Sequence, residues 1–100
     1  MPTVSVDLLD GGSGANERFI AFAVARDLGV AEAGQVFTKP ATVAECVDIG
    51  SVIAEFVNSE EGAFKVHVDG PGGESTLHRI RTDHLADSIA RLVAVSAGFQ

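Results

Sequence analysis

The sequence predicts an α/β domain of the α+β kind, built as two layers in which helices cover a mixed sheet of about four strands. Residues 3–9 and 64–69 alternate apolar and polar side chains, as strands with one buried face do. Residues 41–59 repeat apolar side chains at helical spacing over about four turns. The predicted order is β-α-β-α-β-β-α, without an internal repeat or a linker, so we expect a single domain over residues 1–100.

The first part of the chain predicts two strands and one helix. The strand at residues 3–9 leads into a loop at residues 10–14, whose glycines accept positive φ. A helix is predicted from Asn16, a good N-cap residue, to Leu28, with Gly29 as a natural C′ residue. Its apolar residues go most of the way round the helical wheel, which favours a buried helix over a strand. A short strand at residues 35–39 follows.

The helix within residues 41–59 is the element against which the rest of the chain is expected to pack. Pro40 suits a helix start, Thr42 can cap the first turn, and Glu45 completes a capping box. We expect its main apolar stripe to face the sheet. That stripe consists of Val43, Cys46, Val47, Gly50, Ile53, Ala54 and Val57.

The last part predicts a hairpin and a final amphipathic helix. The turn signal at residues 69–74 joins two strands. The expected register pairs Val68 with Ser75, Val66 with Leu77 and Lys65 with His78, and leaves Lys65, His67, Thr76 and His78 on the outer face. Thr82 or Asp83 is expected to cap the final helix, with Asp87 and Arg91 as an exposed i, i+4 pair. Its inner stripe comprises Leu85, Ile89, Leu92, Val93 and Ser96.

Composition argues against several functional classes. The net charge of −7 disfavours direct binding to nucleic-acid phosphates, which requires clustered lysines and arginines. The single cysteine cannot form an internal disulfide, and the first residues lack the basic and apolar regions of a signal peptide. No apolar run is long enough to cross a membrane. We therefore expect a cytoplasmic protein.

No group of residues indicates a catalytic site, a metal site or a bound cofactor. The loop Gly11–Gly14 lies between a strand and a helix, where backbone N–H groups bind phosphates, but it lacks the motifs of known nucleotide-binding loops. A small nucleotide-binding domain that uses this loop stays open as an alternative. Cys46 lies on the main stripe, so we interpret it as a buried apolar residue rather than a nucleophile. The spacing of His67, His78 and His84 matches no metal-ligand motif.

A second apolar stripe on the central helix is the strongest functional hint in the sequence. Ile49, Val52 and Phe56 lie beside the main stripe and widen the apolar arc to roughly 220°, more than a helix covered on one side needs. Neighbouring helices of the same chain could cover this stripe. Otherwise it forms a partner-binding surface, rimmed by the carboxylates of Glu45, Asp48 and Glu55.

Three stretches together resemble a known family. They are Gly50–Val57 in the central helix, Phe64–Gly73 with its glycine- and proline-rich turn, and Asp83–Val93 in the final helix. In pattern and order of elements the chain is similar to the effector-associated constant component domains of bacterial conflict systems. The resemblance implies a non-enzymatic accessory or adaptor component in defence.

The sequence thus predicts a non-enzymatic module that docks onto a protein partner or onto a second copy of itself. The acidic residues would steer it toward a basic partner. The alternative is an acidic inhibitor, or nucleic-acid mimic, that acts on a nucleic-acid-binding machine.

Overall fold

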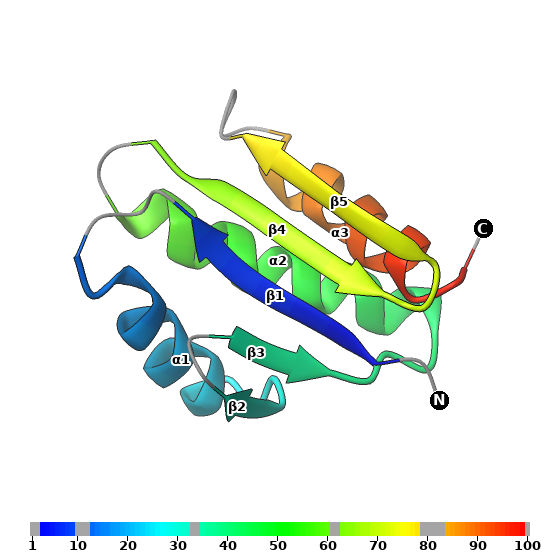
Figure 1. Ribbon diagram of the computed structural model, residues 1–100, viewed down its shortest axis with the longest axis horizontal. Helices are drawn as coiled ribbons and strands as arrows, with labels where there is room; N and C mark the ends of the chain where they lie inside the picture. The colour runs from blue at the N-terminus through cyan, green and yellow to red at the C-terminus, as the bar shows by residue number, and fades with distance from the viewer. Residues whose placement is uncertain (1–2, 10–12, 33–34, 61–62, 79–83, 100) are drawn as a thin grey trace.

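The computed structural model describes residues 3–9, 13–32, 35–60, 63–78 and 84–99. Its elements are β1 (Val4–Leu9), α1 (Ala15–Ala25), β2 (Val30–Glu32), β3 (Gln35–Thr38), α2 (Val43–Ser59), β4 (Lys65–Gly70), β5 (Gly73–His78) and α3 (Leu85–Ser96). The predicted α+β class and the order of elements are confirmed, and the three-residue β2 is an addition. The helices α2 and α3 lie behind the sheet, and α1 lies along its β2–β3 side (Figure 1).

The sheet is antiparallel throughout, so the expectation of a mixed sheet was wrong. Its strand order is β2-β3-β1-β4-β5, and each pair of neighbours runs antiparallel. Helix α2 connects β3 to β4, two strands that run in the same direction, but β1 lies between them. A helix between two strands usually makes them parallel neighbours, which is why a mixed sheet was expected. Here β3 and β4 are parallel but are not neighbours, because β1 pairs with both of them.

The hairpin β4–β5 has the predicted register. Val68 pairs with Ser75, Val66 with Leu77 and Lys65 with His78. The glycine-rich turn and the alternation of side chains in β4 were sufficient to determine this pairing.

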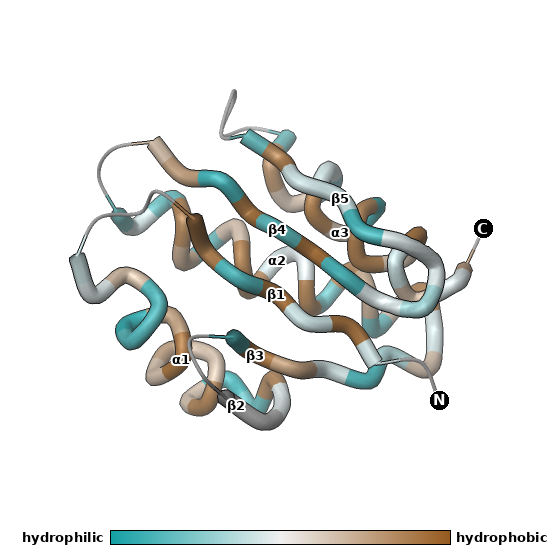
Figure 2. The backbone as a smooth tube through the Cα atoms, in the orientation of Figure 1, coloured by the Kyte–Doolittle hydropathy of each residue, from teal (hydrophilic) through white to brown (hydrophobic). Residues whose placement is uncertain are grey.

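One face of the sheet packs on the helices, and the other is open. The side chains of Val4, Val6 and Leu8 on β1 are buried, as are Val66 and Val68 on β4. Figure 2 shows the matching alternation of apolar and polar residues along these two strands. The strands therefore contribute one side of the core, and the helices contribute the other.

The start of α2 has the predicted Thr42 cap, but not the full capping box. The Thr42 hydroxyl accepts a hydrogen bond from the Glu45 backbone N–H at 3.1 Å, which satisfies one donor that the helix leaves unpaired. Glu45 Oε2 accepts its hydrogen bond, at 3.0 Å, from the N–H of Ala41, the residue before the N-cap, and not from the Thr42 N–H that a capping box uses.

The ends of α1 differ from the prediction. Gly14 is the N-cap residue, and Asn16 instead joins the helix to β1: its Oδ1 accepts the Leu8 N–H at 3.0 Å and its Nδ2 donates to Asp7 Oδ1 at 2.9 Å. At the other end Asp27, not Gly29, occupies the left-handed C′ position, with φ of 55°.

A Schellman motif explains why α1 ends early. The Leu28 N–H donates to the Ala23 carbonyl at 2.9 Å and the Asp27 N–H donates to the Val24 carbonyl at 3.0 Å. Both hydrogen bonds require the left-handed backbone at Asp27, so this turn directs the chain toward β2 before Gly29 is reached.

Gly50 sets the contact between α2 and α3. A Cβ atom at this position would lie 2.6 Å from the backbone nitrogen of Ala90 and 2.8 Å from the carbonyl oxygen of Ala86. The two helices touch backbone to backbone here, which any larger residue would prevent.

Candidate functional site

The side stripe of α2 is largely covered by α1. The Phe56 side chain is only 4% exposed, and Ile49 is also buried. The Phe56 ring lies 5.4 Å from the Phe19 ring and 5.5 Å from the Phe22 ring, measured between centroids. Both side chains are buried, so the expectation that Ile49 and Phe56 form an exposed partner-binding surface was wrong, and α1 covers Phe56.

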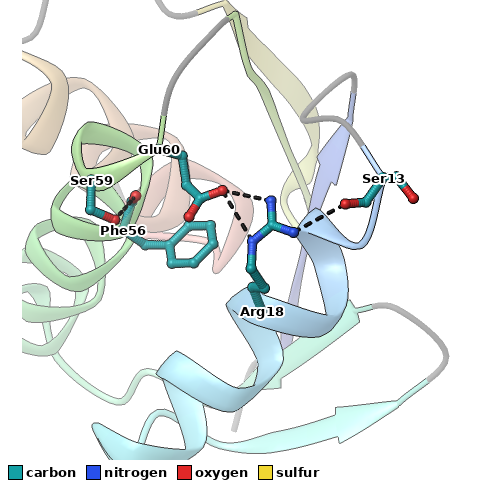
Figure 3. A network of polar contacts seen from close by, with 5 residues as sticks. All are labelled: Ser13, Arg18, Phe56, Ser59 and Glu60. Atoms are coloured by element: carbon teal, nitrogen blue, oxygen red, sulfur yellow. Dashed lines mark hydrogen bonds and ion pairs between the residues drawn. The ribbon is translucent and has the colours of Figure 1, made fainter.

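Two ion pairs hold α1 on α2. Arg18 donates to Glu60 Oε1 from Nη2 at 2.6 Å and from Nε at 3.1 Å, and it also donates to the Ser13 carbonyl at 3.0 Å. Figure 3 shows these contacts beside Phe56, which projects from α2 toward α1. Arg26 pairs with Glu55, so this predicted rim carboxylate is already neutralised within the chain.

The exposed apolar surface of α2 lies on its other flank. Val43 and Val47, which were predicted to face the sheet, are 55% and 49% exposed. They border a groove of about 410 Å³ between α2 and α3, which we call the valine groove. It is lined by Val43, Cys46, Val47, Asp87, Ala90, Arg91, Ala94, Val95 and Phe99.

The valine groove lies beside the point where α2 and α3 touch at Gly50, and several of the side chains that line it are small. Ala90 and Ala94 line it from α3, and Val95 on the same helix is 49% exposed. Asp87 and Arg91 also line it, and neither side chain forms an ion pair with another residue in the described ranges. The predicted Asp87–Arg91 pair is thus absent, and both charges face solvent.

A second hollow, the acidic cleft, lies on the flank of α2 that faces the end of α1. It measures about 320 Å³ and is lined by Arg26, Asp27, Leu28, Thr38, Glu45, Asp48, Ile49 and Val52. Four of the six predicted partner-binding residues meet there: Glu45, Asp48, Ile49 and Val52. The sequence did not indicate the contributions of the α1–β2 turn and of β3, because tertiary packing brings them to α2.

Cys46 is buried at the base of α2, as predicted. Burial raises the pKa of its thiol, and the neighbouring Glu45 carboxylate raises it further. A nucleophilic cysteine requires the opposite shift, because the thiolate is the reactive form. The protonated thiol therefore behaves here as a small apolar group.

The remaining candidates from the sequence do not assemble into a chemical site. His67 Nδ1 lies 2.9 Å from the Thr76 hydroxyl, and its Nε2 lies 3.7 Å from Glu74, all on the open face of the sheet. Among the described residues, no group of three histidine, cysteine or acidic side chains could hold a metal ion. Gly11 and Gly12 of the predicted phosphate-binding loop lie outside the described residues. The N-cap residue of α3 is His84, so the expectation that Thr82 or Asp83 caps this helix was wrong.

None of the helices in the described ranges combines the length and the apolar character needed to cross a membrane. No protein-family model matches the chain, and searches of curated proteins and of solved structures likewise find no match.

Proposed function

We propose that this protein is a non-enzymatic interaction module that docks an apolar helix of a partner protein in the valine groove. The observation that carries the proposal is the concentration of exposed apolar surface at one place. Three of the five large apolar side chains that are most exposed in the described residues, Val43, Val47 and Val95, surround this single groove. Contiguous exposed apolar patches of this kind mark contact surfaces.

The shape of the groove supports a helical occupant. Its walls are two adjacent helices, and the small side chains of Ala90 and Ala94 allow a third helix to approach closely. An amphipathic helix in such a groove would bury its apolar face against the valines. Asp87 and Arg91, which lack ion pairs within the described chain, would contact the polar rim of that helix.

Electrostatics favour a partner protein over a second copy of this chain. Each copy carries a net charge of −7, so two copies repel each other. A neutral partner meets no such penalty, and a positively charged partner would in addition be attracted at long range. The resemblance to accessory components of bacterial conflict systems is consistent with such a role and stays a prediction.

The test compares two valines that are about half exposed or more and lie on different helices. Val47 lines the groove, whereas Val24 lies on α1 outside it and is 58% exposed. The full chain, tagged and isolated from the cells that produce it, should carry its partner as wild type and as Val24→Asp, and should lose the partner as Val47→Asp. Native mass spectrometry gives the mass of each complex.

The outcomes separate the competing functions. Retention of the partner by Val47→Asp, or its loss from both variants, would contradict docking in the groove. If the purified protein forms a dimer on its own, and Val47→Asp dissociates that dimer, the groove binds a second copy of this chain and not a partner protein. Binding that disappears when salt is raised toward about 1 M would indicate the acidic inhibitor or nucleic-acid mimic instead, because ionic contacts are then screened within about 3 Å.

A further inference from the structure

Strand β5 ends the sheet on one side, and its outer edge is open. It pairs with β4 alone, from Lys65–His78 to Gly70–Gly73, and no other strand in the described ranges lies beside it. Figure 1 shows β5 as the outermost strand, with α3 behind it. Every second residue of β5 therefore points its backbone N–H and C=O groups away from β4, where a further strand can pair with them.

The edge of β5 lacks the features that usually prevent edge-to-edge pairing. Such features are a very short strand, a proline or lysine, a bulge, or a charged side chain that points inward. Strand β5 has six residues, GESTLH, and pairs with β4 residue for residue. Its inward-pointing residues, Ser75 and Leu77, lie opposite the buried Val68 and Val66 and are uncharged. The opposite edge of the sheet, β2, has only three residues.

The outward side chains of β5 complement a second copy of the same strand. If two β5 strands pair antiparallel about a two-fold axis at Thr76, Glu74 of each copy lies opposite His78 of the other. A carboxylate then faces an imidazole N–H donor at both ends of the ladder, and two threonines meet at its centre. These side chains share the open face of the sheet with His67, which contacts Thr76 and Glu74, so no helix obstructs them.

The same pairing covers an apolar side chain on the other face of β5. Leu77 packs against the core but is only partly buried. With the axis at Thr76, Ser75 of the second copy lies opposite Leu77 and removes more of its surface from water. An axis at Ser75 would instead place Glu74 opposite Thr76 and lose both carboxylate–imidazole contacts. The side chains on both faces therefore favour the axis at Thr76.

We infer that two copies of this chain pair through β5, antiparallel and with Thr76 at the two-fold axis. The two five-stranded sheets then continue as one sheet of ten strands. The net charge of −7 opposes the encounter of two copies, but at physiological salt charges more than about 8 Å apart are largely screened. At this edge the two contacts between Glu74 and His78 offset the repulsion that remains. The edge is separate from the valine groove, so the inference does not depend on the function proposed above.

Sedimentation velocity of the purified full chain measures the pairing directly. The sedimentation coefficient should rise with concentration from that of a monomer to that of a dimer, with half association on the order of 10–100 µM, because the contact is small. Val47→Asp should dimerise as the wild type does, since Val47 lines the valine groove and not the β5 edge. This comparison separates the dimer from docking in the groove.

Exchanging the charges on β5 tests the register. His78→Glu places two carboxylates opposite each other at both ends of the ladder and should weaken dimerisation at least about tenfold. Combining it with Glu74→Lys restores opposite charges in each pair and should recover most of the affinity. Asn58→Glu, which adds one negative charge at an exposed position on α2, should leave the affinity unchanged. Circular dichroism checks that each variant is folded.

A disulfide locates the two-fold axis at one residue. In a Cys46→Ala background, Thr76→Cys puts two thiols opposite each other at a Cα separation of about 4.5–5.5 Å, which suits a disulfide. Oxidised glutathione should convert this variant to a covalent dimer, as the two thiols are oxidised and glutathione is reduced. Glu74→Cys is the control on the same strand, because its two copies would lie about 14 Å apart and should not cross-link.

Four results would overturn the inference. The first is a protein that stays monomeric at concentrations well above about 100 µM. The second is a double variant that dimerises no better than His78→Glu alone. The third is a covalent dimer of Glu74→Cys that forms as readily as that of Thr76→Cys. The fourth is a dimer that Val47→Asp dissociates, which would place the contact in the valine groove.

Discussion

Replacing Phe56 by alanine removes the ring that joins α1 to α2. The side chain is 4% exposed and contacts the rings of Phe19 and Phe22. Phenylalanine-to-alanine changes in a core typically lower the free energy of unfolding by about 3–5 kcal/mol. Each aromatic pair adds about 0.5–1.5 kcal/mol to what burial alone provides, so we expect the upper part of that range. This is a large share of the about 5–15 kcal/mol that stabilises a typical domain.

Urea denaturation followed by circular dichroism measures the effect. With an m-value of about 1.5–2 kcal/mol per M, a loss of about 4 kcal/mol lowers the midpoint by about 2–2.7 M. Val47→Ala is the control on the same helix, and it should change stability by no more than about 0.5 kcal/mol, because Val47 is half exposed and alanine favours helix. If Phe56→Ala changes the midpoint as little as Val47→Ala does, α1 does not cover this flank of α2 and the assignment of the two flanks is wrong.

Three further predictions test the backbone and the buried thiol. Gly50→Ala should gain about 1 kcal/mol of helix propensity but lower stability by about 1–3 kcal/mol overall, because its Cβ would lie 2.6 Å from the Ala90 nitrogen; an unchanged or raised urea midpoint would contradict this close contact. Asp27→Gly should stabilise the protein by about 1 kcal/mol and raise the melting temperature by about 4–8 °C, since the left-handed backbone suits glycine; a lower melting temperature would be evidence against strain at this residue. The pKa of the Cys46 thiol is raised in the folded protein, so above about pH 8.5 the unfolded chain loses the thiol proton while the folded protein keeps it, and the free energy of unfolding should fall as pH rises. In urea denaturation at several pH values, Cys46→Ala should show a smaller fall than the wild type. An equal fall in both proteins would contradict the raised pKa of Cys46.

The local elements could be read from the sequence because short-range physics determines them. The cap of α2 depends only on the Thr42 hydroxyl and the Glu45 N–H, three residues apart. The register of the β4–β5 hairpin follows from one turn and from the alternation of side chains on β4, since a shift by one residue would expose Val66 and Val68. Cys46 lies within the apolar arc of α2, which is sufficient to predict that its side chain is buried.

The end of α1 shows where local reading fails. Glycine is the usual residue at a left-handed C′ position, so Gly29 was the natural choice. The chain uses Asp27 instead, which places a carboxylate at the rim of the acidic cleft. Aspartate tolerates this backbone better than most residues do, but no sequence pattern marks it in advance.

The spacing of apolar residues along residues 41–59 is enough to predict that α2 carries more apolar surface than one covering layer requires. Which part of that surface is buried depends on how the other helices pack against α2. The helical wheel gives the width of the apolar arc, whereas the positions of α1 and α3 determine which edge is covered. The aromatic contacts of Phe19 and Phe22 hold α1 over Phe56, and the backbone contact at Gly50 holds α3 so that Val43 and Val47 stay exposed. The acidic cleft likewise needs three elements that are distant in sequence, and only packing brings them together.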